Sequence, residues 1–213
     1  MAKVGAVHLV GESIVGLLNQ RRALLAQEGV LAPVPATQDI AHVPVAKLVS
    51  TTPPTSGLSL TCYHIARSDH GRRVVAGGNR SERIGISLEL HYLLACWSGT
   101  ASDELALMSW AMLELNRFST LGAGQLLGDV WDRDEMIQLA PGDETPDQLA
   151  RLWEGFKSKY RLSATYRARV VRIGYGTGQD SLPVVTSRFS FADGDVALEP
   201  VAGVAGGAAK AAA

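Results

Sequence analysis

The sequence contains few features that mark a secreted or a membrane protein. It has only two cysteines in 213 residues, without a CxxC spacing, so we expect unpaired thiols and synthesis in a reducing cytoplasm. Its apolar runs are far shorter than the roughly 18 residues that a membrane helix needs. Glu12 and Asn19 interrupt the N-terminal apolar stretch, which is unlike the apolar core of a secretory signal. We therefore expect neither a signal peptide nor direct insertion into a membrane.

The sequence also has almost no net charge. Its 20 Lys and Arg residues are matched by 21 Asp and Glu residues, which gives a net charge of −1. Without an overall positive field, nucleic acid is not an expected partner. With 46% hydrophobic and 19% charged residues, the composition is that of an ordinary folded domain. Most of the basic residues are Arg, which favours contacts at protein interfaces.

Catalytic motifs are missing as well. The sequence contains neither a GxSxG elbow nor an HExxH zinc motif. The glycine run at 174–178 lacks the Lys-Ser/Thr of a phosphate loop and is not followed by a predicted helix. Asp132, Asp134 and Glu135 have no partner nucleophile, and a solvated loop explains them. These absences predict a protein that is not an enzyme and needs no cofactor.

One compact group of side chains has the chemistry of a metal site, namely Cys62, His64, His91 and Cys96. Cys62 and His64 share one face of their predicted strand. His91 and Cys96 fall on opposite faces of theirs, so the four side chains would not converge on a single ion. We therefore predict no metal site here.

Among the features present, the first is an opening helix that Gly29 ends. Five prolines between Val30 and Pro54 then exclude a long helix or a central strand, and leave a loop with one short extended piece near 43–50. The apolar stripe of this helix runs over about five turns at three- and four-residue spacing and comprises Val7, Val10, Ile14, Leu17, Leu18, Leu24 and Leu25.

Alternating apolar and polar residues predict three long strands. The segments 58–67 and 84–97 alternate with a period of two, and the Gly-, Ser- and Arg-rich segment 68–83 connects them as a pair. The segment 161–170 alternates apolar side chains with Arg161, Arg167 and Arg169, which makes one face strongly basic. Tyr160 and Tyr166 have the opposite parity, so nucleic acid is disfavoured there. Carboxylates of a neighbouring subunit and plain solvent remain open as partners of this face.

The segment 103–118 predicts a helix with apolar side chains nearly all round, which requires two neighbours. One neighbour is the sheet, and the other is either another part of the fold or a second subunit. We take Trp110 and Leu113 as interface candidates on this helix. A short helix at 122–127 and a strand at 135–139 are expected next. Thr145, Pro146 and Gln148 then have the pattern of a capping box that starts a further helix.

These elements predict an α/β (α+β) fold with a mixed, largely antiparallel sheet flanked by helices in a single domain at 1–175. An extension at 176–199 contains an edge-strand-like piece at 184–191, which Pro183 introduces. Its alternating Val185, Phe189 and Phe191 are further interface candidates for pairing with a partner strand. The Gly- and Ala-rich tail at 200–213 is expected to be disordered.

Two sequence blocks carry a resemblance to a known family. They are SLELHYLL at 87–94 and LWEGFKSKYRLSATYRARVV at 152–171, with the helix at 104–112 between them. In order and spacing they resemble the N-terminal domain of the tail-terminator or cap proteins of extracellular contractile injection systems, the phage-tail-like particles of the virulence-cassette and antifeeding-prophage type. The likeness runs from about residue 5 to residue 175.

The resemblance implies a cap that forms a six-fold ring on the end of the inner tube, ends tube growth and helps to complete the sheath. The implied partners are further copies of the chain, the tube protein and the sheath protein, in a particle that is released or stays inside the cell. A neck or connector subunit of a phage is the related alternative. A small enzyme or ligand-binding domain with its site at 68–83 is the alternative from another class.

Overall fold

The computed structural model describes residues 2–29, 39–49, 54–68, 85–131 and 135–174, all of which belong to one compact unit, Met1–Gly178. The connection at 69–84, the edge-strand-like piece at 184–191 and the tail at 200–213 lie outside the described residues. Val185, Phe189 and Phe191 therefore remain interface predictions.

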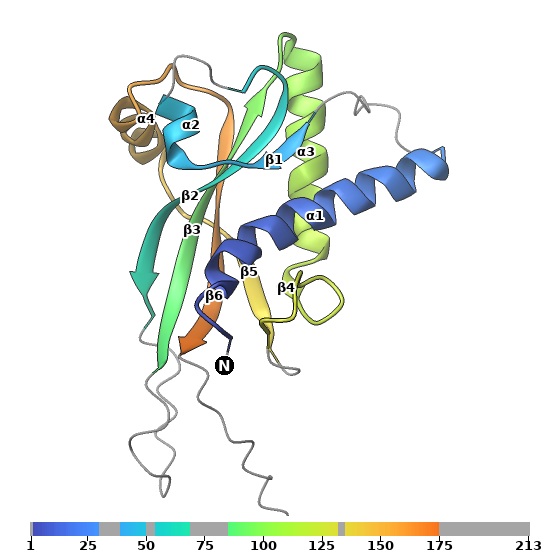
Figure 1. Cartoon of the computed structure of the whole chain (residues 1–213). Coiled ribbons are helices and arrows are strands. Elements are labelled where there is room, and N and C mark those ends of the chain that lie inside the picture. The colour runs from blue at the N-terminus through green and yellow to red at the C-terminus, as the bar shows by residue number, and fades with distance from the viewer. Residues whose placement is uncertain (1, 30–38, 50–53, 69–84, 132–134, 175–213) are drawn as a thin grey trace, which may run out of the picture. The chain divides into compact units, whose positions relative to one another are not determined.

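A six-stranded sheet forms the centre of the unit, in the order β1-β2-β3-β6-β5-β4 (Figure 1). Only β1 and β2 are parallel, and every other neighbouring pair is antiparallel. This confirms the predicted mixed, largely antiparallel sheet. The strands are β1 (Ile40–His42), β2 (Gly57–Arg67), β3 (Gly85–Trp97), β4 (Thr120–Leu121), β5 (Ile137–Pro141) and β6 (Ser163–Gly174).

The helices of the described residues are α1 (Ala6–Gln27), α2 (Val45–Val49), α3 (Ala101–Arg117) and α4 (Pro146–Gly155). The side chain of Thr100 accepts a hydrogen bond from the backbone N–H of Asp103 and caps α3. Thr145 and Gln148 form the predicted capping box at the start of α4. Because such caps satisfy backbone donors that have no partner inside the helix, they fix where each helix begins.

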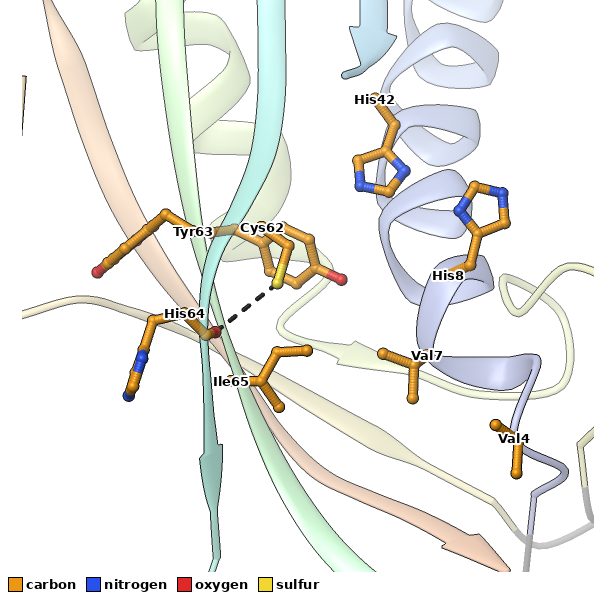
Figure 2. A pocket seen from close by; sticks show the side chains of 9 residues that line it. Val4, Val7, His8, His42, Cys62, Tyr63, His64 and Ile65 are labelled. Atoms are coloured by element: carbon orange, nitrogen blue, oxygen red, sulfur yellow. Dashed lines mark hydrogen bonds between the residues drawn. The ribbon is translucent and has the colours of Figure 1, made fainter. Parts of the chain in front are cut away.

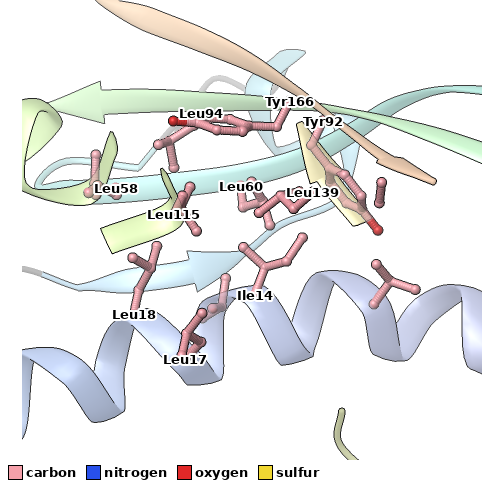
Figure 3. Close-up of a cluster of buried hydrophobic side chains, with 14 of the residues drawn as sticks. Ile14, Leu17, Leu18, Leu58, Leu60, Tyr92, Leu94, Leu115, Leu139 and Tyr166 are labelled. Carbon is pink, nitrogen blue, oxygen red and sulfur yellow. The ribbon is translucent and has the colours of Figure 1, made fainter. Parts of the chain in front are cut away.

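Helices cover both faces of the sheet. The larger core lies between the sheet and the helices α1 and α3, and Figure 3 shows its side chains converging from both layers. Ile14 and Leu18 of α1 meet Leu60 and Leu94 of the sheet, and all four are fully buried. This arrangement confirms the apolar stripe predicted for the opening helix except at Leu24, which is 40% exposed.

A smaller core forms on the other face, under α2 and α4. Trp153 of α4 meets the ring of Trp97 edge-on at a centroid distance of 6.2 Å and the ring of Phe156 at 6.0 Å. The indole of Trp153 donates a hydrogen bond to Ser163 at 3.1 Å, and that of Trp97 donates one to Ser59 at 2.8 Å. The indole N–H groups of Trp97 and Trp153 therefore both have a polar partner, as buried indoles usually do.

Two predicted local elements differ from the structure. Within the piece near 43–50, Val43 N still pairs with Leu60 O beside β1, but residues 45–49 form α2 and are not extended: Lys47 N donates to Pro44 O, and Leu48 lies in the smaller core, where it is 1% exposed. The segment 122–127 is a turn and not a helix, with two backbone N–H groups donating to the carbonyl of Gly122. Three glycines between 122 and 128 explain this, because glycine destabilises a helix interior.

Irregular pairing changes the faces that strict alternation predicts. A register shift in β2 leaves Tyr63 as an extra residue, so that Cys62 pairs with Tyr92 and His64 pairs with His91. Cys62 packs against the larger core, whereas the His64 ring contacts the His91 ring on the opposite face. The prediction that Cys62 and His64 share a face is therefore wrong, since a β-bulge reverses the alternation.

Candidate functional surfaces

An apolar stripe lies on the outside of α3. Leu105, Met112 and Leu113 are 58%, 44% and 65% exposed, and their spacing places them on one side of the helix. The opposite side packs against α1 and the sheet. Another part of the fold therefore supplies the second neighbour that the sequence requires, and the outer stripe is apolar surface beyond that packing. We call Leu105, Met112 and Leu113 the α3 stripe.

The two interface candidates on α3 have different positions. Leu113 lies in the α3 stripe and is its most exposed member. Trp110 belongs to the larger core and is 8% exposed, and its indole N–H is buried without a hydrogen-bond partner among the described residues. Trp110 therefore offers little area to a second chain. The apolar pattern of α3 alone does not distinguish such a buried tryptophan from one at the surface.

A charged cluster lies beside the smaller core, on the sheet face that carries α2 and α4. It comprises Glu89 and His91 of β3, Asp143, Glu144, and Arg167 and Arg169 of β6. Nη2 of Arg167 lies 2.6 Å from Oδ1 of Asp143. Nε of Arg169 lies 2.9 Å from Oε2 of Glu89, an ion pair in which the N–H does not point at the oxygen. The chain itself therefore supplies carboxylates to the basic face of β6, besides the two sources predicted from the sequence. A contact of Arg167 or Arg169 with another subunit stays a prediction.

Hydrogen bonds and burial set the charge state of this cluster. Burial acts to raise the pKa of Glu144, but hydrogen bonds donated by Thr165 and Tyr63 outweigh it, so this pKa lies below its ordinary value. Burial lowers the pKa of His91 and outweighs the opposing effect of the nearby carboxylate of Glu89. The cluster therefore favours ionised carboxylates together with a neutral imidazole near neutral pH.

Arg161 lies at the other end of the same face, before β6 begins. Its guanidinium carbon is 5.3 Å from the ring centroid of Trp97, at a distance typical of a cation–π contact. The three arginines predicted as one basic face are thus divided between two places. Arg161 borders the smaller core, and Arg167 and Arg169 belong to the charged cluster.

A pocket of about 600 Å³ lies between the start of α1 and strand β2 (Figure 2). Burial raises the pKa of the Cys62 thiol, which faces the pocket, so this thiol stays protonated at neutral pH and is a poor nucleophile. The residues that line the pocket are Val4, Val7, His8, His42, Cys62, Tyr63, His64, Ile65 and Tyr92.

Sequence reasoning misses a group of three polar side chains, of which His8 and His42 line this pocket and Glu12 lies beside them. Oε1 of Glu12 lies 3.8 Å from Nε2 of His8 and 3.1 Å from Nδ1 of His42. His8 and Glu12 are four residues apart on α1, and this spacing is visible in the sequence. His42 comes from β1, thirty residues further along the chain. Only the parallel pairing of β1 with β2 brings it against α1, and no local pattern predicts that pairing.

None of the helices in the described part of the chain combines the length and the hydropathy of a membrane-spanning segment.

Comparisons with known proteins connect the chain to one family. The model of the family described as the Pvc16 N-terminal domain matches residues 9–187, which is well over half of the chain. The comparison with curated proteins gives no match.

Two solved structures are similar to the chain. One is the sheath/tube terminator of the extracellular contractile injection system PVC in its extended state, at 20% identity and a TM-score of 0.43, with coverage of 85% of this chain and 65% of that one. The other is the anti-feeding prophage cap, a tube terminating cap, at 14% identity and a TM-score of 0.45, with coverage of 81% of this chain and 59% of that one. The chain thus spans less than two thirds of the length of either protein.

Proposed function

We propose that this chain, which belongs to the Pvc16 N-terminal domain family, is a structural cap on the inner tube of a contractile injection system. In this role it forms a ring on the last layer of the tube, ends tube polymerisation and helps to complete the sheath. The two similar structures are described as a sheath/tube terminator and as a tube terminating cap. The proposal gives this chain the same role.

The exposed α3 stripe is the feature that supports the formation of a ring. A cap needs a head-to-tail surface that closes on itself, because a contact that does not close builds an open filament. Leu105, Met112 and Leu113 present apolar area along one side of a helix whose other side is already buried. Helix surfaces of this kind form the apolar centre of an interface, where charged residues are depleted. We propose that the stripe packs against an adjacent copy in a homohexamer.

The other partners follow from the proposed position of the ring. One rim contacts the tube protein and the other completes the sheath, so the chain acts by assembly and not by catalysis. The charged cluster of β6 is the polar surface that we assign to a contact at the rim, since partly exposed ion pairs there tune orientation more than affinity. Nucleic acid is not a proposed partner, in keeping with the net charge of −1.

The experiment compares self-assembly of the purified full-length chain with that of Leu113→Asp, by electron microscopy and analytical ultracentrifugation. Leu113 is 65% exposed, so the substitution leaves the core untouched. A carboxylate in the apolar centre of an interface is left without a partner and weakens association strongly. We expect rings from the original chain and monomers from Leu113→Asp.

Met136→Asp is the matched control, because Met136 is 67% exposed but lies outside α3. It makes the same change of character at an equally exposed position, and rings should persist. Rings from Leu113→Asp as abundant as those from Met136→Asp would contradict the assignment of the α3 stripe. A chain that stays monomeric at high concentration, even with tube ends present, would contradict the cap itself.

A further inference from the structure

Two imidazoles and one carboxylate converge where α1 passes β1, and the proposed cap function does not use them. We propose that His8, Glu12 and His42 bind a divalent transition-metal ion of the zinc class. The three ligand atoms all lie within 4.8 Å of one another. Among the described residues this is the one group of three such side chains with that geometry. Two histidines and one carboxylate are a common ligand set for zinc sites that leave one position open.

His42 is held in place by the elements around it. Its side chain is 13% exposed, and its ring meets Tyr92 edge-on at a centroid distance of 6.2 Å. A Cβ at Gly11 would lie 2.5 Å from Cε1 and Nε2 of His42, so α1 accommodates the ring because residue 11 is glycine. Nδ1 is the nitrogen that faces Glu12, at 3.1 Å. His42 is therefore oriented before any ion binds, which favours the affinity for the metal.

Two of the three distances between ligand atoms are close to those that a zinc ion requires, and the third, between the two imidazoles, is at most 4.8 Å. With bonds of about 2.0–2.2 Å, the ligand atoms of a tetrahedral site lie roughly 3.3–3.6 Å apart. The observed separations of 3.1 Å between Glu12 and His42 and 3.8 Å between His8 and Glu12 lie on either side of that value. The side chain of His8 is 68% exposed, so it is free to turn through the remaining gap.

The donor set selects the class of ion. Imidazole nitrogens suit zinc, copper and nickel, whereas magnesium and calcium prefer sites made of oxygen ligands. The fourth position of a tetrahedral ion is left to a small ligand, and His8 and His42 both border the pocket at the start of α1 (Figure 2). Cys62 also borders the pocket but does not belong to the group of ligand atoms.

A bound ion joins α1 to an edge strand of only three residues. The side chain of Asn19 donates a hydrogen bond to Ile40 O at 3.1 Å, a polar link between the same two elements. An ion that binds the folded chain more tightly than the unfolded one stabilises the fold by mass action. We therefore expect zinc to raise the melting temperature in proportion to the logarithm of its concentration.

The test uses metal-free, full-length protein without a histidine tag. Zinc is titrated by calorimetry and cobalt(II) by visible absorption, since cobalt shows its coordination geometry. We expect one ion per chain and the visible bands of a four-coordinate cobalt site. Glu12→Gln keeps the shape of the side chain and removes its charge, and His42→Ala removes one ligand. Each should weaken zinc binding at least about tenfold, since even partners outside the ligand shell contribute 10- to 100-fold.

His64→Ala is the control, because it removes a histidine of β2 next to the same pocket whose ring contacts His91 on the opposite face of the sheet and which is not one of the three ligands. Its zinc affinity should equal that of the original chain. Circular dichroism confirms that each variant is folded. No binding by the original chain, with metal in large excess, overturns the proposal. Equal zinc binding by the original chain and Glu12→Gln also overturns the proposal, because the ion is then adventitious. Glu12 and His42 would then form only a hydrogen bond, with His8 beside them.

Discussion

The ion pair between α1 and α3 allows a stability prediction with a defined magnitude. Nε of Arg21 donates to Oε2 of Glu114 at 2.8 Å, and these side chains are only 16% and 5% exposed. The Arg21 guanidinium also lies 5.5 Å from the ring centroid of Phe118. Arg21→Met keeps most of the aliphatic stem but removes the cation, which leaves the carboxylate of Glu114 buried without its partner.

Removing one member of a buried pair costs about 3–5 kcal/mol, because the remaining charge is not compensated. We expect this decrease in the free energy of unfolding, measured by urea denaturation at neutral pH. It is a large part of the roughly 5–15 kcal/mol that stabilises a domain. The double variant Arg21→Met/Glu114→Leu buries no charge and should recover most of the loss.

A second ion pair of similar geometry provides the control. Nη2 of Arg151 lies 3.0 Å from Oδ2 of Asp147 on α4, and these side chains are 76% and 72% exposed. Exposed pairs of this spacing contribute about 0.3–0.5 kcal/mol, so Arg151→Met should have little effect. If Arg21→Met costs no more than Arg151→Met, or if the double variant is as unstable as the single one, the argument from burial is refuted.

Three further predictions concern the backbone, a helix cap and pH. Gly57 has φ +85°, and a Cβ there would lie 1.8 Å from Asp39 O, so Gly57→Ala should lower the free energy of unfolding by about 2–4 kcal/mol in urea denaturation. Gly29→Ala is the control and should cost about 1 kcal/mol, because φ there is +69° but no atom lies near. Equal costs for the two variants would contradict the clash. Thr145→Ala removes the capping box of α4 and should lower the melting temperature by an amount equivalent to about 1 kcal/mol. Burial lowers the pKa of His91 below 6.5, so the unfolded chain binds the extra proton more readily than the folded one, and the free energy of unfolding should fall as pH drops below about 6.5. His91→Gln should reduce this dependence on pH in denaturation series at several pH values. An unchanged dependence would show that His91 is not its source.

Elements with strong local signals could be predicted from the sequence. The alternation at 84–97 gave β3, because its even residues Leu90 and Leu94 face the larger core and its odd residues, such as Leu93, face the smaller one. The capping box at Thr145 gave the start of α4, since that signal depends on three adjacent residues and not on distant contacts. The apolar spacing of α1 was equally informative.

Features that depend on distant contacts could not be predicted. Alternation cannot reveal the bulge at Tyr63, because an inserted residue leaves the local composition unchanged while reversing the faces beyond it. Trp110 is buried because α3 packs on α1, and its residue type alone fits an interface equally well. The group of His8, Glu12 and His42 likewise exists only because β1 lies beside α1.

Tube length in the particles tests the cap most directly. Particles are purified from cells that lack this gene and from cells in which the gene has been restored, and the lengths of their inner tubes are measured by electron microscopy. A ring that ends polymerisation predicts a broad length distribution without the protein and one uniform length when it is restored. Tubes of the same uniform length in both preparations would contradict the account.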